Sequence, residues 1–377
     1  MQSDLLLVIV IAAALAFDFT NGFHDTASVV ASSISTSALS PRAAIAIASV
    51  LNFVGALISL RVAATVATGI VDANRVTESI MFAGLVGAIA WNLVTWAYGL
   101  PSSSSHALIG GIVGAMLASV GVAGVKVGGL FTNVLAPALI APLAALAVAG
   151  VLIVAIVWMF GRRRPGSVSR GFRLGQVVSG SLLAVSHGTN DAQKTMGVIG
   201  LALIAHGDVT AHNFHVPAWV VVSAALALAL GTYAGGWRII RTVGTRIIKM
   251  NTAQGFAAQS AGAVVTLVSS QLGYPLSTTQ VISGGVVGAG AAKRLSAVRW
   301  GVAGNIVTAW ALTIPGAGLL AAGAYWVATA LGGGAVGPLL ISAVAIGSAV
   351  GVLASRRGPR ASTPGIRLRE AAAPPPR

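Results

Sequence analysis

The scarcity of charge along the chain constrains its fold more than any other feature. Only 8% of the 377 residues are charged, whereas 56% are hydrophobic. Since ordinary globular chains carry about 25% charged residues, this chain cannot cover a water-exposed surface with polar side chains. Apolar segments of about 20 residues, the length that crosses a bilayer as a helix, recur along nearly the whole sequence. The sequence therefore predicts a polytopic membrane protein.

The apolar segments favour helices over a transmembrane β-barrel, because they show little of the alternation that barrel strands need. The 47 glycines and 14 prolines are typical of closely packed and interrupted membrane helices. We therefore expect an all-α fold of about 11 spans, with broken helices or re-entrant hairpins. Residues 79–120 fit either two spans or one re-entrant hairpin.

The basic residues lie in short clusters between the apolar segments, for example at 162–173, at 238–249 and after 355. Because such separated clusters orient membrane spans, the formal charge of +15 does not predict a nucleic-acid partner. The positive-inside rule places the N-terminus outside and the C-terminus in the cytoplasm. We expect a multi-pass protein of the plasma (inner) membrane, embedded in its lipid bilayer.

Two motifs recur in the same order in the two halves of the chain. The run Gly99-Leu100-Pro101-Ser102-Ser103-Ser104-Ser105-His106 returns 174 positions later as Gly273-Tyr274-Pro275-Leu276-Ser277-Thr278-Thr279-Gln280. The run Asn21-Gly22-Phe23-His24-Asp25 returns as His187-Gly188-Thr189-Asn190-Asp191. Five spans per half is an odd number, so the second half would begin on the opposite face, as in the inverted repeats of secondary transporters.

This arrangement predicts five consecutive parts. They are a first inverted repeat (1–160), a basic cytoplasmic linker (161–174), a second inverted repeat (175–331), an extra transmembrane helix (332–354) and a disordered basic cytoplasmic tail (355–377).

Two of the eight acidic residues occupy equivalent positions in the two repeats. Asp25 and Asp191 each follow a glycine inside an apolar segment. Because acids at membrane depth are costly, they usually mark ion or proton pathways. We interpret this pair as cation or proton sites beside helices broken at the glycine; capping of a broken helix end is the structural alternative. Asp18 also lies at depth, without a counterpart, and is interpreted as a supporting residue.

The repeated hydroxyl clusters predict an anion site. Each cluster follows a proline and precedes a glycine-rich helix, which places free backbone N–H groups, the positive end of the helix dipole and several O–H donors at one point. Close helix packing by small residues is the alternative interpretation. The candidate anion ligands are Ser103, Ser104, Ser105, Ser277, Thr278 and Thr279.

No arginine lies within these motifs, so hydroxyl and amide donors must hold the anion. This suits a small tetrahedral oxyanion with many acceptor oxygens. Two ionised aspartates beside an anion would repel it in a low dielectric unless a cation or proton accompanies it. Lys194 lies three residues after Asp191, on the same helical face, and we expect the two to pair; contact with the anion is the alternative.

The histidines fall into two groups. His24, His106 and His187 lie in the motifs, and each can carry a proton near neutral pH or serve as a structural donor. His206, His212 and His215 lie in a predicted outside loop, where solvated polar surface is the expected role and a metal site is the alternative. No resident metal site is predicted.

Together these residues resemble the inorganic phosphate transporter (PiT) family. The resemblance covers both halves, through Asp18-Phe19-Thr20-Asn21-Gly22-Phe23-His24-Asp25-Thr26-Ala27, His187 to Lys194, and the Pro-x-Ser-Ser/Thr runs at 101–105 and 275–279. It implies a phosphate permease in which the six hydroxyl residues bind phosphate and Asn21, Asp25, Asn190 and Asp191 hold the coupling ion. His24-Asp25 and Gln193-Lys194 are similar to the bacterial low-affinity Pit branch, which is linked to protons and metal–phosphate complexes.

Gln280 stands where a histidine is common in that branch. With Asp18, His24, His106, His187 and Lys194, it is a candidate for carrying protons or supporting the site.

We therefore expect a secondary transporter that imports inorganic phosphate with a cation, protons ahead of sodium, or as a divalent metal–phosphate complex. The alternatives are sodium-coupled phosphate symport, a sulfate permease on the same scaffold and a passive anion channel. We expect no enzyme, because Ser105 and the adjacent His106 on one helix do not form an oriented nucleophile and base. No cofactor is expected, and a homodimer is compatible with the sequence.

Overall fold

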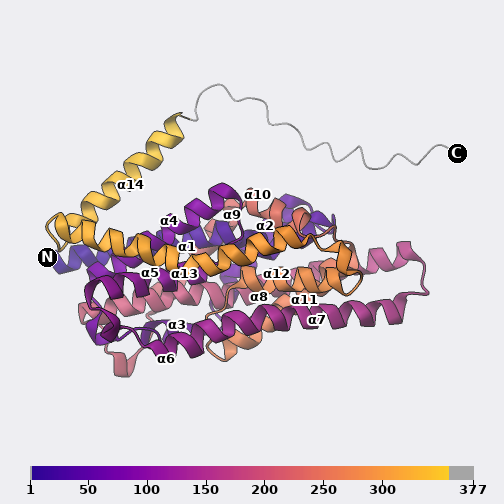
Figure 1. Ribbon diagram of the computed structural model, residues 1–377, viewed down its shortest axis with the longest axis horizontal. Coiled ribbons are helices and arrows are strands. Elements are labelled where there is room, and N and C mark those ends of the chain that lie inside the picture. The colour runs from indigo at the N-terminus through magenta and orange to yellow at the C-terminus, as the bar shows by residue number, and fades with distance from the viewer. Residues whose placement is uncertain (1, 356–377) are drawn as a thin grey trace.

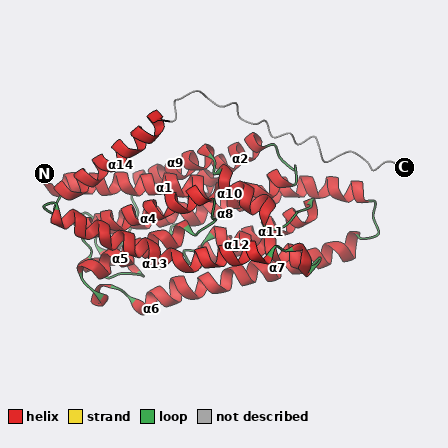
Figure 2. Ribbon diagram, turned by 45° about the horizontal axis from the view of Figure 1, so that its top comes forward, coloured by secondary structure: helices red, strands yellow, loops and turns green. Residues whose placement is uncertain are grey.

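The computed structural model describes residues 2–355, and these form an elongated bundle of α-helices (Figure 1, Figure 2). The all-α prediction is confirmed, because the described residues contain no strand and only one isolated bridge, between Val71 and Val125. The helices are α1 (Gln2–Ser35), α2 (Pro41–Ala56), α3 (Arg61–Thr68), α4 (Glu78–Tyr98), α5 (Ser104–Ser119), α6 (Val127–Leu130), α7 (Ala136–Phe160), α8 (Pro165–His206), α9 (Ala218–Ala234), α10 (Trp237–Arg241), α11 (Thr252–Gln271), α12 (Thr278–Ala291), α13 (Trp300–Ala330) and α14 (Val336–Ser355).

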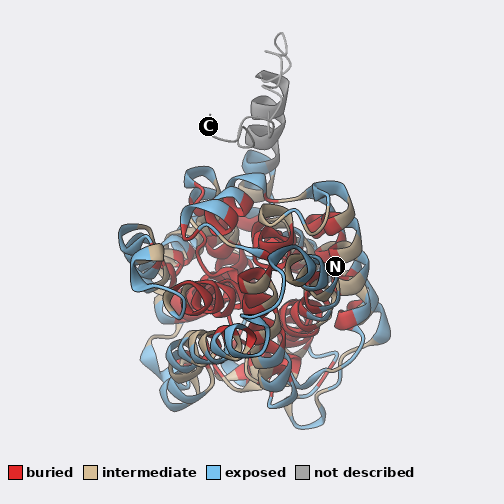
Figure 3. Cartoon of the chain, turned by 90° about the vertical axis from the view of Figure 1, so that its right-hand side faces the viewer, coloured by how far each residue is buried: buried red, intermediate tan, exposed pale blue. Residues whose placement is uncertain are grey.

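The residues at the centre of the bundle are buried and those on its outside are exposed, as Figure 3 shows in the view along the long axis. Helix α1 packs against α4, α8 and α9, while α8 also packs against α2 and α11. Large apolar side chains such as Leu139 and Val151 of α7 and Leu319 of α13 are exposed. Exposed apolar faces of this kind are stable in lipid rather than in water. The structure is therefore that of a membrane-embedded protein.

Four helical segments are long and apolar enough to cross a membrane, namely Ser3–Ser35, Glu78–Tyr98, Val127–Phe160 and Trp300–Ala330. Two bent helix pairs, Pro41–Ala56 with Arg61–Thr68 and Ala218–Ala234 with Trp237–Arg246, pass the same test together. Helix α8 is long enough but carries many buried polar side chains, which lower its hydropathy. The total of about 11 spans stays a prediction.

The predicted break of the first helix at its Asn-Gly-Asp motif is wrong. Helix α1 runs without interruption through Gly22 and Asp25, and α8 runs in the same way through Gly188 and Asp191. A single glycine costs a helix only about 1 kcal/mol, which is too little to break it when both flanks are packed.

The two motif glycines instead let helices approach each other closely. A Cβ atom on Gly188 would lie 2.7 Å from the backbone Cα of Asn52 in α2, and closer still to its carbonyl oxygen. A Cβ atom on Gly22 would lie 2.9 Å from the backbone nitrogen of Thr232 in α9 and closer to the Leu228 carbonyl oxygen. These glycines therefore fix how closely the neighbouring helices approach α1 and α8.

Helices α5 and α12 are short and begin deep inside the molecule. With 16 and 14 residues they are about 24 and 21 Å long, less than the roughly 30 Å of a bilayer core. Helix α4 ends at Gly99, whose φ of 65° turns the chain into the non-helical segment before α5. The equivalent segment before α12 follows Gly273, with φ 84°. Both segments place an unwound stretch and a helix N-terminus in the protein interior.

The ends of the chain differ in part from the predicted division. Helix α8 begins at Pro165, so most of the predicted linker 161–174 is the start of that helix. Helix α14 overlaps residues 332–354 and runs away from the bundle in Figure 1, and its role as an extra transmembrane helix stays a prediction. The predicted tail lies outside the described residues from 356 onwards.

Candidate functional site

The predicted site residues meet where the middles of α1 and α8 face the N-termini of α5 and α12. All of them are almost completely buried, with side chains at most 4% exposed. Helix α1 supplies Asp18, Asn21, His24 and Asp25, and α8 supplies His187, Asn190, Asp191 and Lys194. The α5 segment supplies Ser103, Ser104, Ser105 and His106, and the α12 segment supplies Ser277, Thr278, Thr279 and Gln280.

The two short helices begin in the same way. The Ser103 hydroxyl accepts a hydrogen bond from the His106 backbone N–H at 3.0 Å, and the Ser277 hydroxyl accepts one from the Gln280 N–H at 3.3 Å. Each serine is therefore the N-cap of its helix. His106 and Gln280 occupy equivalent positions in the two motifs, and His106 Nδ1 lies 3.3 Å from Gln280 Nε2. The positive ends of both helix dipoles thus meet at one place.

Asp25 is held by donors from both halves of the chain. Its Oδ2 accepts a hydrogen bond from the Ser104 hydroxyl at 2.5 Å, and its Oδ1 accepts one from the Thr279 hydroxyl at 2.8 Å. His24 Nδ1 lies 3.0 Å from the same Oδ1. The partners of Asp25 are thus hydroxyls and an imidazole, and no lysine or arginine is among them.

Asp191 has a different set of partners. Lys194 Nζ lies 2.7 Å from its Oδ1, so the expected pairing is present. The Asn21 amide donates to its Oδ2 at 3.4 Å, and His187 Nε2 lies 3.4 Å from the same oxygen without a well-aligned hydrogen bond. A fixed positive charge therefore lies against Asp191.

The two acids are close together although they are 166 positions apart in the chain. One oxygen from each of Asp25 and Asp191 and one ring nitrogen of His187 all lie within 4.8 Å of one another. Three groups at this spacing can hold a metal ion, although the sequence predicted no resident metal. Two buried carboxylates this close repel each other strongly unless a proton or cation lies between them.

Several buried oxygen atoms around these acids have no hydrogen-bond partner among the described residues. Both carboxylate oxygens of Asp18 belong to this group, as do Asn21 Oδ1, Asn190 Oδ1 and the Thr195 hydroxyl. Unpartnered buried acceptors are costly, which favours the presence of a positive ligand or proton. The carboxylate and amide oxygens in this group can accept a hydrogen bond from a proton-bearing or positively charged ligand.

The six hydroxyl residues are not equivalent. Ser103 and Ser277 are N-caps, and Ser104 and Thr279 donate to Asp25. The Ser105 hydroxyl donates to the Leu276 carbonyl oxygen at 3.1 Å and accepts from Lys194. The Thr278 hydroxyl is buried and unpartnered.

Four residues outside the repeated motifs, which the sequence patterns did not identify, hold the site in place. Asn52 of α2 links His187 to Thr232. Its Oδ1 lies 3.1 Å from His187 Nδ1, and its Nδ2 donates to the Thr232 hydroxyl at 2.8 Å. The other three contact motif residues. The Ser28 hydroxyl donates to Thr279, the Thr95 hydroxyl lies beside His24 Nε2, and the Ser270 hydroxyl accepts from the Asn190 amide. A polar residue in an apolar segment, as Asn52 is, is the signal that points to them.

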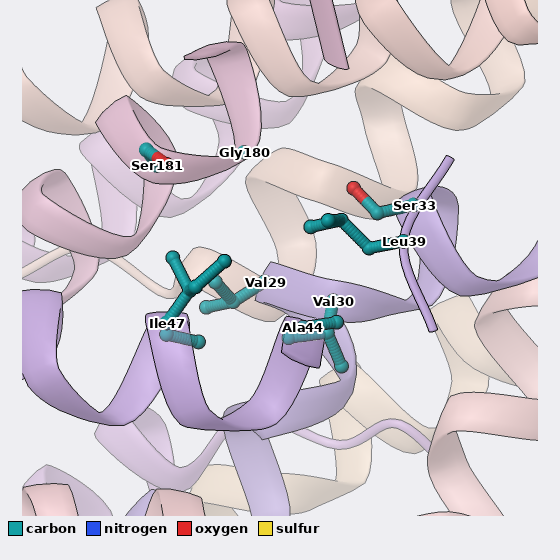
Figure 4. A pocket seen from close by; sticks show the side chains of 9 residues that line it. Val29, Val30, Ser33, Leu39, Ala44, Ile47, Gly180 and Ser181 are labelled. Carbon is teal, nitrogen blue, oxygen red and sulfur yellow. The ribbon is translucent and has the colours of Figure 1, made fainter. Parts of the chain in front are cut away.

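The described cavities lie away from this cluster. The pocket between α1, α2 and α8 in Figure 4 has a volume of about 10 Å³, too small for more than one water molecule. A larger cavity of about 430 Å³ lies between the end of α1 and the starts of α8 and α11, lined by Thr36, Arg173 and Asn251 among others. The candidate site is closed to solvent, because its side chains are almost completely buried.

The outer histidine group does not form a metal site in the part of the chain that the structure describes. His206 pairs with Glu78, with 2.7 Å between Nδ1 and Oε1, and lies 3.4 Å from Asp4 Oδ1. The Glu78 hydrogen bond raises the pKa of His206 above its usual value. His215 Nδ1 lies 3.2 Å from the Asn213 carbonyl oxygen, and the assignment of this group to solvated polar surface stays a prediction.

Residues 21–321 match the phosphate transporter family. A probable low-affinity inorganic phosphate transporter of Mycobacterium bovis is 53% identical over 332 residues, covering 87% of this chain and 79% of that protein. One from Rhizobium meliloti is 48% identical and one from Bacillus subtilis 42%, each covering 86% of this chain, with 96% and 97% of the relative covered.

A solved structure titled the sodium-dependent phosphate transporter has the same fold, with a TM-score of 0.80 at 24% identity. It covers 86% of this chain and 99% of the other. The family and these relatives are transporters rather than enzymes. With the matched residues including both aspartates and both hydroxyl clusters, the chain belongs to the phosphate transporter family and transports inorganic phosphate.

Proposed function

We propose that this protein imports inorganic phosphate across the plasma membrane by symport with a cation, with its N-terminus outside. The observation that carries the proposal is the juxtaposition of two buried carboxylates, Asp25 and Asp191, with the N-termini of two short helices. Helix N-termini attract an oxyanion, while two carboxylates repel it. The anion is therefore stable in this place only together with positive charge.

Phosphate recognition would come from the starts of α5 and α12. Both helices begin with a serine cap and a run of hydroxyl residues, and their N-termini meet at the contact between His106 and Gln280. A tetrahedral oxyanion with several acceptor oxygens can accept hydrogen bonds from both helix starts at once. Thr278 is the first candidate among the hydroxyls, because its hydroxyl has no other partner.

The coupling cation would be bound among the oxygen atoms that lack partners, beside Asp25, Asn21, Asn190 and Asp191. A proton can reside on a carboxylate or on His187, which lies within 4.8 Å of both acids. Sodium is the alternative, because the solved relative of the same fold is titled sodium-dependent. A divalent metal carried together with phosphate is a second candidate, favoured by the imidazole that lies beside two carboxylates.

Transport would follow from alternating exposure of this closed site to the two sides of the membrane. The repeated motifs and the two short interior helices are compatible with inverted repeats that move against each other. The homodimer stays a prediction from the sequence.

The test is uptake of radiolabelled phosphate by proteoliposomes under imposed gradients. Wild type is expected to accumulate phosphate above electrochemical equilibrium when a pH gradient, acid outside, is imposed, whereas a passive channel would only equilibrate it. Asp25→Asn should abolish gradient-driven accumulation, while Asp72→Asn, a half-buried acid that caps the short turn at Ala73–Arg75, is the control. Unchanged uptake by Asp25→Asn would refute the site assignment.

Further arms of the same assay identify the transported anion and the coupling cation. Competition by arsenate without competition by sulfate supports phosphate over sulfate, because arsenate matches the size and protonation of phosphate. A sodium gradient at constant pH and the co-uptake of a divalent metal separate the three coupling modes. Accumulation driven by sodium alone would overturn the proton assignment.

A further inference from the structure

Among the residues whose burial the structure describes, Lys194 is the one lysine or arginine with a fully buried side chain. Its ammonium group contacts three oxygen atoms: Asp191 Oδ1 at 2.7 Å, the Leu276 carbonyl oxygen at 2.6 Å and the Ser105 hydroxyl at 2.5 Å. A protonated lysine has three N–H donors and no acceptor. The Ser105 hydroxyl gives its own proton to the Leu276 carbonyl oxygen, so all three atoms act as acceptors toward Lys194.

These three oxygen atoms come from three separate parts of the fold. Asp191 lies on α8, Ser105 lies in the first turn of α5, and the Leu276 carbonyl lies in the unwound segment before α12. Lys194 therefore links the two helix starts that we assign to phosphate. The linkage is tertiary, because Ser105 and Leu276 are 89 and 82 positions away from Lys194.

The three oxygen atoms are also the ligand types that membrane transporters offer to a free monovalent cation. Carboxylate, hydroxyl and unwound backbone carbonyl oxygens commonly bind Na⁺ at the interface between repeats. A lysine ammonium carries the same single charge. The neighbouring acid, Asp25, has hydroxyl and imidazole partners and no such fixed charge.

We propose that the Lys194 ammonium is a tethered cation that occupies a monovalent cation site between the two halves of the protein. The negative charge of Asp191 is then neutralised permanently by Lys194. The mobile coupling cation can therefore bind only beside Asp25. Lys194 thus determines cation specificity and stoichiometry. This rests on the proposed function, since it assigns one of the two carboxylates of the same site.

The test removes the tether and asks whether a free cation replaces it. Purified Lys194→Ala in lipid nanodiscs is heated in sodium chloride, in methylammonium chloride and in choline chloride at equal ionic strength. Sodium and methylammonium are expected to raise its Tm relative to choline, and by more than they raise that of wild type. At 100 times its Kd, a bound cation multiplies the folded-to-unfolded ratio about 100-fold.

Two variants serve as controls. In the double variant Lys194→Ala with Asp191→Asn, the carboxylate is absent and the added cation effect should disappear. Lys126→Ala removes an exposed lysine that donates to the Thr68 carbonyl oxygen, and it should respond to sodium as wild type does. The readout is thermal stability, so a failure of phosphate uptake, which would refute the proposed function, leaves this result interpretable.

Three outcomes would overturn the tethered cation. One is a Lys194→Ala protein that folds but responds to sodium and methylammonium no more than wild type. Another is an equal response in the double variant. The third is a Lys194→Ala protein that folds in none of the three salts while the double variant folds in all of them, because the tether itself would then be indispensable.

Discussion

Substitution of Gly188 by alanine tests whether this glycine sets the distance between α8 and α2. An added Cβ would lie 2.7 Å from both the Cα and the carbonyl carbon of Asn52. Because carbon atoms pack at about 3.5–4.0 Å, α2 must move away by roughly 1 Å. Overpacking of this kind costs about 1–3 kcal/mol, and the better helix propensity of alanine offsets about 0.5–1 kcal/mol of it.

The matched control is Gly171→Ala on the same helix. Gly171 is exposed, and a Cβ added there meets no atom within 4 Å, so only the propensity gain of about 0.5–1 kcal/mol remains. We expect Gly188→Ala to unfold about 2–5 °C below wild type and Gly171→Ala to unfold at or above it.

Thermal unfolding of the purified variants, followed by tryptophan fluorescence, measures these shifts. Phosphate uptake by Gly188→Ala should fall as well, because a movement of α2 displaces the hydrogen bond between Asn52 and His187 beside Asp191. A Tm of Gly188→Ala equal to or above that of Gly171→Ala would refute the close-packing role of Gly188 and would favour a flexible role instead.

Three further predictions follow from other polar contacts in the structure. Asn52→Ala removes one hydrogen bond from each of two buried partners, His187 and Thr232, so it should destabilise the protein by about 1–3 kcal/mol, seen as a lower Tm. Thr279→Val removes a hydrogen bond to the Asp25 carboxylate and should lower the Tm. Thr278→Val removes a hydroxyl that has no partner and should leave the Tm unchanged. Equal losses of Tm in the two variants would contradict the hydrogen bond between Thr279 and Asp25. The hydrogen bond that His206 donates to the Glu78 carboxylate raises the pKa of His206 above its usual 6.5 in the folded state. The stabilisation is therefore complete below about pH 6.5 and is lost as the pH rises through the higher folded pKa, so the Tm should fall across this range in wild type and less so in Glu78→Gln.

The sequence by itself determined the class of fold and the residue types of the site. With so few charges, the apolar segments can be satisfied only by lipid and by internally bonded helices, and this excludes a water-soluble domain. The pairing of Lys194 with Asp191 was also predictable, because residues three apart lie on the same face of one helix. These conclusions depend on local composition and spacing alone.

Only the tertiary structure decided what each motif residue contacts. Gly22 and Gly188 looked like helix breakers, but the carbonyl groups that they accommodate belong to α9 and α2, far away in the sequence. The rotation of α5 and α12 about their axes determines which hydroxyl faces Asp25, and packing against other helices sets that rotation. Lys194 likewise meets Leu276 and Ser105 only after the two halves have come together. Long-range contacts of this kind depend on the relative placement of whole helices, which local propensity and spacing do not encode.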